Sequence, residues 1–225
     1  MVAISAVLYF LAHHPFWSFP LILFGAMALG VLISRWRGGG WWAWLTLAGF
    51  LFAQFNIFTG HILNAWFLDA AGTRSTAVIV DSRPTNSTLN DSTVYEYDAV
   101  LKTADGRDVD ISFDTMSAST WPIRNAILIP PQGAPFVAKY VPGFERNIAI
   151  MVDESDYGKA LLIAEDREPV QRAARRLEVS PGNPRYIAEY RAEVAKFLAR
   201  HERALPAAEV ETLRQSLRAL PEPAP

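Results

Sequence analysis

The chain has 225 residues, with 21 Lys or Arg, 23 Asp or Glu and no cysteine, and its formal net charge is -2 at pH 7. The lack of cysteine excludes disulfides, thiolate zinc sites and cysteine nucleophiles. The near-neutral balance provides no basic surface of the kind that nucleic-acid binding needs, so no nucleic-acid partner is expected. The apolar residues gather at the start of the chain, and no Asp, Glu, Lys or Arg precedes Arg35.

Two long apolar segments dominate the first third of the chain. Phe16 to Ser34 contains nineteen residues without a charge, and Trp41 to Leu68 contains twenty-eight. About 20 apolar residues of helix cross the hydrocarbon core of a bilayer, which is ~30 Å thick. We therefore predict a membrane α-helical hairpin, in which both segments span the bilayer and residues 1–68 form the membrane region.

The role of the first apolar segment, Val2 to Ala12, stays open. It has neither the positive start nor the small-residue end of a signal peptide, and we expect it to remain in the mature protein. It spans the membrane, lies on its surface, or extends the first helix with a kink at Pro15, because proline removes a backbone donor and clashes with the preceding turn.

Arg35 and Arg37 predict the orientation of the hairpin. Both lie between the two apolar segments, whereas no Lys or Arg precedes the first segment and the next one after the second is Arg74. Loops rich in Lys and Arg stay in the cytoplasm. We therefore expect a multi-pass protein of the bacterial inner membrane, with the rest of the chain, including its C-terminus, in the periplasm.

Five polar residues interrupt the second apolar segment: Gln54, Asn56, Thr59, His61 and Asn64. Polar groups inside a membrane often mark a transport pathway, but Asn, Gln and His also hydrogen-bond neighbouring helices. Neither segment contains a charged relay group. We expect Gln54, His61 and Asn64 to share one side of the helix and to form a contact between helices or protomers.

Residues 73–152 are predicted to form a small antiparallel β-domain, curled into a barrel or sandwich. Thr76 to Val80 is rich in strand-forming residues, Val94 to Leu101 alternates in polarity, and Asp105-Gly106 predicts a hairpin turn before the strand Arg107 to Phe113. Five or six short strands of this kind are typical of such domains. We expect the core to contain five aromatic residues: Tyr95, Tyr97, Phe113, Phe136 and Tyr140.

The order of these features carries a resemblance. A membrane span is followed by Thr76 to Val80, Val94-Tyr95-Glu96-Tyr97, the Asp105-Gly106 turn, and Gly133 through Tyr140-Val141-Pro142-Gly143. From about Asn56 to Val152 the chain thus resembles the bacterial membrane proteins grouped as domain of unknown function 3592. The resemblance implies a fold and no activity, and the tail beyond it departs from the short family pattern.

Residues 153–225 are predicted to form an α-helical extension of three helices. The first covers Gly158 to Val179, and Pro184 and Pro206 begin the other two, each with an amphipathic stripe. Acidic residues are interspersed among the basic residues of this tail, and they cancel most of its positive electrostatic field. The apolar side chains of the stripes have to be buried against something, and seven of them form a candidate partner surface: Ile187, Tyr190, Val194, Phe197, Val210, Leu213 and Leu217.

Catalytic and metal-binding patterns are missing from the sequence. Three of the four histidines lie in the apolar N-terminal region, and no nucleophile elbow, zinc-protease or phosphate-loop motif occurs. The alternating aspartates after Asp105 stand about 6.5–7 Å apart on a strand, too far for one calcium ion. We therefore expect no enzyme activity, no metal and no cofactor.

The function that these observations favour is a membrane-anchored, non-enzymatic binding protein. Its expected partners are the lipid bilayer and a protein, either a different chain or a second copy. A more specific hypothesis is an immunity protein against a secreted toxin. The alternatives are an accessory subunit of a transport or channel assembly and a cell-envelope hydrolase with carboxylates from distant positions.

Overall fold

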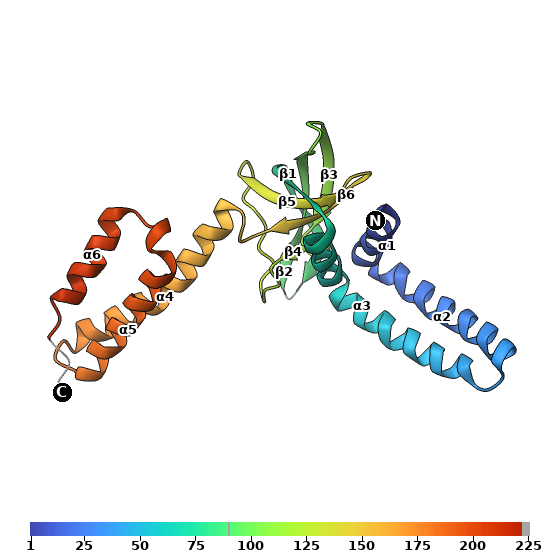
Figure 1. Ribbon diagram of the computed structural model, residues 1–225, viewed down its shortest axis with the longest axis horizontal. Helices are drawn as coiled ribbons and strands as arrows, with labels where there is room; N and C mark the ends of the chain where they lie inside the picture. Colours follow the sequence, from blue (N-terminus) through green and yellow to red (C-terminus); the bar gives the residue numbers. More distant parts are fainter. Residues whose placement is uncertain (90, 222–225) are drawn as a thin grey trace. The chain divides into compact units, whose positions relative to one another are not determined.

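The computed structural model describes residues 1–89 and 91–221. The chain divides into two compact units, Met1–Gly158 and Lys159–Pro225. The first unit contains three apolar helices followed by a six-stranded sheet, and the second contains the C-terminal helices (Figure 1). The apolar helices and the sheet belong to the first unit.

The N-terminal helices are α1 (Val2–His13), α2 (Pro15–Arg37) and α3 (Trp41–Ala71). His14 leaves the helical conformation and separates α1 from α2, with Pro15 at the first position of α2, where its missing N–H is not needed. The first apolar segment therefore forms a helix of its own. By length and composition, α2 and α3 are able to cross a membrane.

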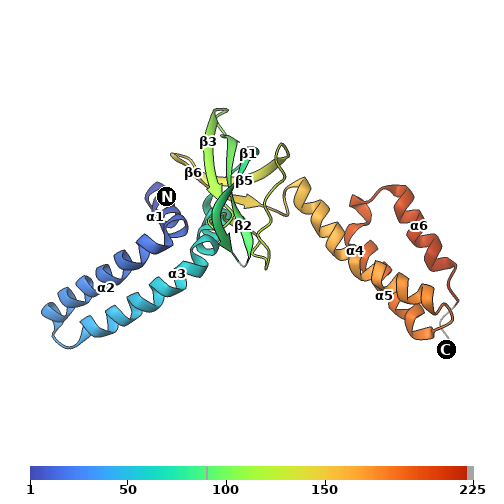
Figure 2. The same cartoon turned by 180° about the vertical axis from the view of Figure 1, so that it is seen from behind.

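Small residues bring α2 and α3 close together along the helical pair (Figure 2). A Cβ atom added to Gly30 would lie 2.7 Å from the Cα atom of Trp42, and one added to Gly49 would lie 2.4 Å from the Cβ atom of Ala26. Close backbone approach at small residues is how apolar helices associate when the hydrophobic effect does not drive them together.

The sheet has the order β3-β2-β1-β5-β6-β4. Its strands are β1 (Thr73–Leu89), β2 (Ser92–Lys102), β3 (Asp108–Asp114), β4 (Thr120–Trp121), β5 (Pro135–Val141) and β6 (Phe144–Met151). All neighbours are antiparallel except β4, which runs parallel to β6. The sheet is therefore mixed and open, and not the antiparallel barrel or sandwich that the sequence predicted. The reason is the proline-rich stretch 122–135, which leaves only the two-residue β4 at that edge, so no strand joins β6 to β3.

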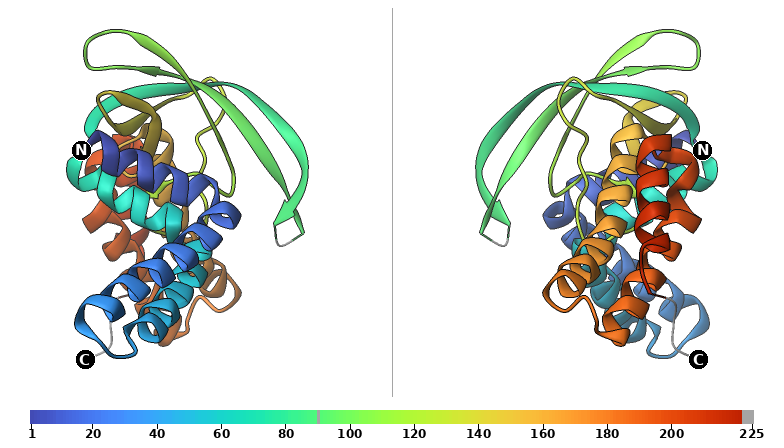
Figure 3. Two further views of the ribbon diagram at one scale, coloured as in Figure 1. Left: turned by 90° about the vertical axis from the view of Figure 1, so that its right-hand side faces the viewer. Right: turned by 90° about the vertical axis from the view of Figure 1, so that its left-hand side faces the viewer.

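The core of the sheet contains most of the expected aromatic residues. Phe113, Phe136 and Tyr140 are buried, and Tyr97 packs against them. Tyr95 is 41% exposed, so its placement in the core was wrong. It lies opposite Pro84, where the paired ends of β1 and β2 project beyond β5 (Figure 3) and no second layer covers them.

The turn between β2 and β3 is held by Asp105. Its carboxylate accepts hydrogen bonds from the Thr103 hydroxyl and from Arg107 Nε, the latter at 2.7 Å, and Gly106 adopts a φ of 86°. These two hydrogen bonds lower the pKa of Asp105 from its ordinary 3.8 to about 2.

We expect the Asp105→Asn variant to lose stability at neutral pH, because the amide replaces a carboxylate that both partners favour. Because the pKa of Asp105 is lower in the folded than in the unfolded state, its ionised carboxylate stabilises the fold fully at a pH above the unfolded value near 3.8. This stabilisation is lost as the pH falls through the folded value of about 2. Denaturant unfolding of both proteins at neutral pH and at several acidic pH values measures this. The difference should shrink between about pH 4 and pH 2; a constant difference would contradict the argument.

The second unit contains α5 (Pro184–His201), a short 3-10 turn η1 (Glu202–Ala204), α6 (Ala207–Arg218) and most of α4 (Asp156–Val179). The Asn183 side chain accepts a hydrogen bond from the N–H of Arg185 at 3.0 Å and caps α5, with Pro184 at its first position. The helices share a core of their own: Val170, Ala173, Tyr190, Val194, Phe197, Leu198 and Val210.

Candidate functional site

The polar residues of α3 do not act as one face. Ten positions separate Gln54 from Asn64, which rotates the side chain by about 80° on a helix of 3.6 residues per turn. Gln54 is accordingly exposed, Asn64 is fully buried and His61 is half-buried. The face that packs instead carries Asn56, Gly60 and Asn64, spaced four residues apart.

Asn56 joins the three N-terminal helices. Its Nδ2 atom donates to the carbonyl oxygen of Leu11 at 3.1 Å and to Ser18 Oγ at 3.0 Å. Ser18 in turn donates to the carbonyl oxygen of Pro15 at 2.9 Å. The amide nitrogen of Asn56 is thus engaged in contacts between helices. A residue that lines a transport pathway would instead keep its polar group free for the transported species.

Asn64 contacts the sheet and not another N-terminal span. Its Nδ2 donates to Ser119 Oγ and to Asn147 Oδ1, both at 2.8 Å. Asn147 Nδ2 donates back to Asn64 Oδ1 at 2.8 Å and to Ser5 Oγ at 2.9 Å. All four residues are buried. This network locks α1, α3, β6 and the segment before β4 together, so the intramembrane interpretation of Asn64 is replaced by a role in docking the helices to the sheet.

The last turns of α3 belong to the sheet. Ala65 and Leu68 are fully buried against three residues of β5 and β6: Val141, Ala149 and Met151. Lys139 Nζ donates to the Asp69 carboxylate at 2.6 Å and to the Asp69 carbonyl oxygen at 2.9 Å, which satisfies the C-terminal end of α3. The last residues of the predicted span 41–68, from Asn64 to Leu68, therefore pack on the sheet.

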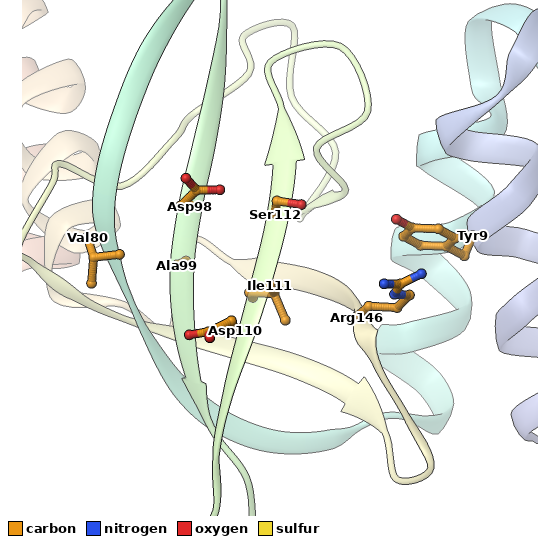
Figure 4. Close-up of a pocket in the computed structure, with 8 residues that line it drawn as sticks. All are labelled: Tyr9, Val80, Asp98, Ala99, Asp110, Ile111, Ser112 and Arg146. Carbon is orange, nitrogen blue, oxygen red and sulfur yellow. The ribbon is translucent and has the colours of Figure 1, made fainter.

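A pocket of about 390 Å³ opens between β3 and the opposite pair Tyr9 and Arg146 (Figure 4). Along β6, Ile148 and Ile150 face the core of the sheet, while Ala149 and Met151 face α3. The same alternation places Arg146 on the core side at the open end. The other lining residues come from β1, β2 and β3: Val80, Asp98, Ala99, Asp110, Ile111 and Ser112.

The free edge of β3 borders this pocket. The N–H of Thr103 donates to the carbonyl of Arg107, and the N–H of Thr115 to the carbonyl of Tyr95. In the antiparallel register of β2 and β3, these bonds alternate, so the odd-numbered residues of β3 bond to β2. The backbone N–H and C=O groups of Asp110 and Ser112 therefore point outward, and among the described residues no strand pairs with them.

Of the charged residues around the pocket, one has an ion-pair partner and two have none among the described residues. Asp98 binds Arg83, with its carboxylate 2.6 Å from Nη2. Asp110 and Arg146 make no ion pair within residues 1–89 and 91–221. An unpaired guanidinium beside free backbone donors and acceptors is suited to hold an extended peptide with a carboxylate. Sequence reasoning missed Arg146, although a charge on the core-facing side of a strand was a signal for it.

The tail residues expected to form a partner surface are inside the second unit. Ile187, Tyr190, Val194, Phe197 and Val210 are buried, and Leu213 and Leu217 pack against them. The apolar stripes of α5 and α6 cover each other and α4. The partner-surface interpretation of these side chains is therefore corrected, because they supply the core of their own unit.

The two arginines that predict orientation lie at the exposed end of α2. The guanidinium of Arg37 lies 5.6 Å from the ring centroid of Trp36. In the part of the chain that the structure describes, no group of three or more His, Cys, Asp or Glu side chains is placed to hold a metal ion.

No protein-family model, curated protein or solved structure matches this chain, and the resemblance to domain of unknown function 3592 stays a prediction.

Proposed function

We propose that the chain is a membrane-anchored, non-enzymatic binding protein that holds an extended segment of a protein partner along β3. The anchor is the pair α2 and α3, and the binding surface is the pocket between β3, Tyr9 and Arg146. The observation that carries the proposal is the coincidence of a free strand edge with an unpaired arginine in one pocket.

The exposure of apolar side chains supports the anchor. Only 11% of the most apolar part of α2 and 22% of that of α3 is buried, whereas a core helix of a soluble protein would be mostly buried. Phe16 is 77% exposed and Phe58 is 73% exposed. Contiguous apolar surface of this extent needs a lipid or protein environment. With Arg35 and Arg37 on the cytoplasmic side, the sheet lies in the periplasm of a bacterial inner-membrane protein.

The chemistry of β3 supports a basic, extended partner. Asp108 and Asp110 alternate with apolar residues on this strand. Opposite charges on directly facing residues stabilise a pair of strands, and like charges destabilise it. A second copy of β3 would bring aspartates together, so a segment with Lys or Arg at alternate positions fits better. Arg146 then binds a carboxylate of that segment.

We expect the Arg146→Glu variant to bind such a segment at least about ten-fold more weakly, since a hydrogen bond between charged groups contributes ~1.5–3 kcal/mol. The probe is a fluorescent peptide of alternating lysine and valine with a free C-terminal carboxylate. Its anisotropy is measured with the full chain in nanodiscs. Arg175→Glu, which makes the same charge change at an exposed arginine of the tail, is the control.

The Asp110→Pro variant tests the strand edge separately. Proline removes only the outward N–H, which has no partner in β2, and is tolerated on edge strands. Its binding should fall to the level of Arg146→Glu while its unfolding midpoint stays near that of the wild type. Unchanged affinity in both variants would rule out strand addition at β3.

A further inference from the structure

A second pocket, of about 190 Å³, lies where α1, α2 and α3 meet the segment that follows β3. Its apolar walls include Phe16 and Ile57, which belong to the two candidate membrane helices. Its polar wall is formed by His13, His61 and Asp114. The pocket lies beside the start of α2, where the helical pair ends and the sheet begins. It is therefore apolar toward the proposed membrane and polar toward the sheet.

The Asp114 carboxylate is only partly used by the protein. Its Oδ1 atom accepts hydrogen bonds from the N–H groups of Met116 at 2.7 Å and Ser117 at 2.8 Å. The Oδ2 atom has no hydrogen-bond partner among the described residues. One negative acceptor is thus available at the polar wall.

His13 adds a neutral acceptor. Its Nδ1 atom lies 3.1 Å from the carbonyl oxygen of Tyr9, and because a carbonyl only accepts, Nδ1 carries the proton. Burial lowers the pKa of His13 and favours the neutral ring. In that tautomer Nε2 carries no hydrogen and accepts.

Asn56 adds a buried acceptor. The residue is 1% exposed, and its Oδ1 atom has no hydrogen-bond partner within the described residues. A Cβ atom placed on Gly60, which also lines the pocket, would lie 3.1 Å from this oxygen. Leaving a buried carbonyl oxygen unpaired costs about 1–3 kcal/mol, which a bound donor offsets.

We propose that this pocket binds the primary ammonium of an aminophospholipid headgroup, such as that of phosphatidylethanolamine. An ammonium group has three N–H donors and no acceptor, which matches a carboxylate, an imidazole nitrogen and an amide oxygen. The quaternary ammonium of phosphatidylcholine has no N–H and does not match. Free amines share the ammonium, but Phe16 and Ile57 favour a ligand with acyl chains. The inference rests on the proposed membrane anchor.

Native mass spectrometry of the full chain released from vesicles of mixed phosphatidylethanolamine and phosphatidylcholine tests this proposal. We expect retained phosphatidylethanolamine in the wild type and about ten-fold less in Asp114→Asn, because the lost charge-assisted hydrogen bond is a strong one. Asparagine keeps the Oδ1 atom that holds Met116 and Ser117. Asp91→Asn, at the exposed turn between β1 and β2, makes the same charge change outside both pockets and should retain the lipid.

A second variant protects the test against misfolding of Asp114→Asn. The ring centroids of His13 and Tyr9 lie 3.8 Å apart. His13→Phe keeps an aromatic ring at this position and removes the Nε2 acceptor, so it should also lose phosphatidylethanolamine. Equal retention of the two lipids by the wild type, or unchanged preference in both variants, would overturn the proposal. Displacement of the lipid by soluble phosphoethanolamine at equal concentration would show that the pocket binds the ammonium group without the acyl chains, and it would contradict the claim that the ligand is a lipid. Flotation of the protein with the vesicles tests the membrane anchor separately. A protein that does not float with them lacks the anchor, and both proposals then fail.

Discussion

The Asn147→Ala variant is expected to unfold with a free energy about 2–3 kcal/mol below that of the wild type. Asn147 is fully buried and exchanges two hydrogen bonds of 2.8 Å with Asn64. Its truncation leaves Asn64 Oδ1 buried without a donor and removes the bond to Ser5. The cost of an orphaned buried polar group, plus a small cavity, dominates the change.

Thermal and denaturant unfolding in one detergent measure this effect. Asn86→Ala, at an exposed position of β1, removes the same side chain where no buried partner depends on it, and it should be near neutral. The Asn64→Ala, Asn147→Ala double variant should lose less than the sum of the single variants, because the two residues share their hydrogen bonds. Additive losses would show that the two amides act independently.

The Gly49→Leu variant should lose the close packing of α2 and α3. A Cβ at this position would already lie 2.4 Å from the Cβ atom of Ala26 and 3.4 Å from the carbonyl oxygen of Ile22. Overpacking of this kind typically costs about 1–3 kcal/mol, which outweighs the helix-propensity gain of up to about 1 kcal/mol from replacing glycine. The unfolding midpoint in detergent micelles should therefore fall.

Gly25→Leu is the matched control on α2. No atom lies within 4 Å of a Cβ at Gly25, so this variant gains propensity without a clash and should be as stable as the wild type or more so. Equal destabilisation by the two substitutions would mean that helix contact at Gly49 is not the cause. If Gly49→Leu were as stable as Gly25→Leu, the close contact between α2 and α3 would contribute nothing to the stability of the protein.

Local patterns of the sequence predicted the elements well. Pro184 begins a helix as expected, Asp105-Gly106 makes the turn between β2 and β3, and the two long apolar segments are helices. Each of these signals acts over a few residues: a fixed φ, a missing N–H or a short period of polarity. Such signals need no knowledge of the rest of the chain.

Contacts between distant residues were decided by the tertiary structure. The hydrogen bonds of Asn147 reach residues 83 and 142 positions away, so no local pattern showed that Asn64 docks on the sheet. The apolar stripes of α5 and α6 were correctly recognised as needing cover, but a stripe does not say whether the cover is a partner or its own unit.

By itself, the sequence located the helices and most of the strands, and it showed that the N-terminal helices are apolar enough to span a membrane. It did not show that β1 continues to Leu89 or that Thr120–Trp121 forms β4. The tertiary structure alone decided that the sheet stays open and that Arg146 faces the free edge of β3. It also decided that Asp114 and His13 meet in one pocket. The physical reason is that conformation follows from neighbours along the chain, whereas a binding site depends on which distant surfaces pack together.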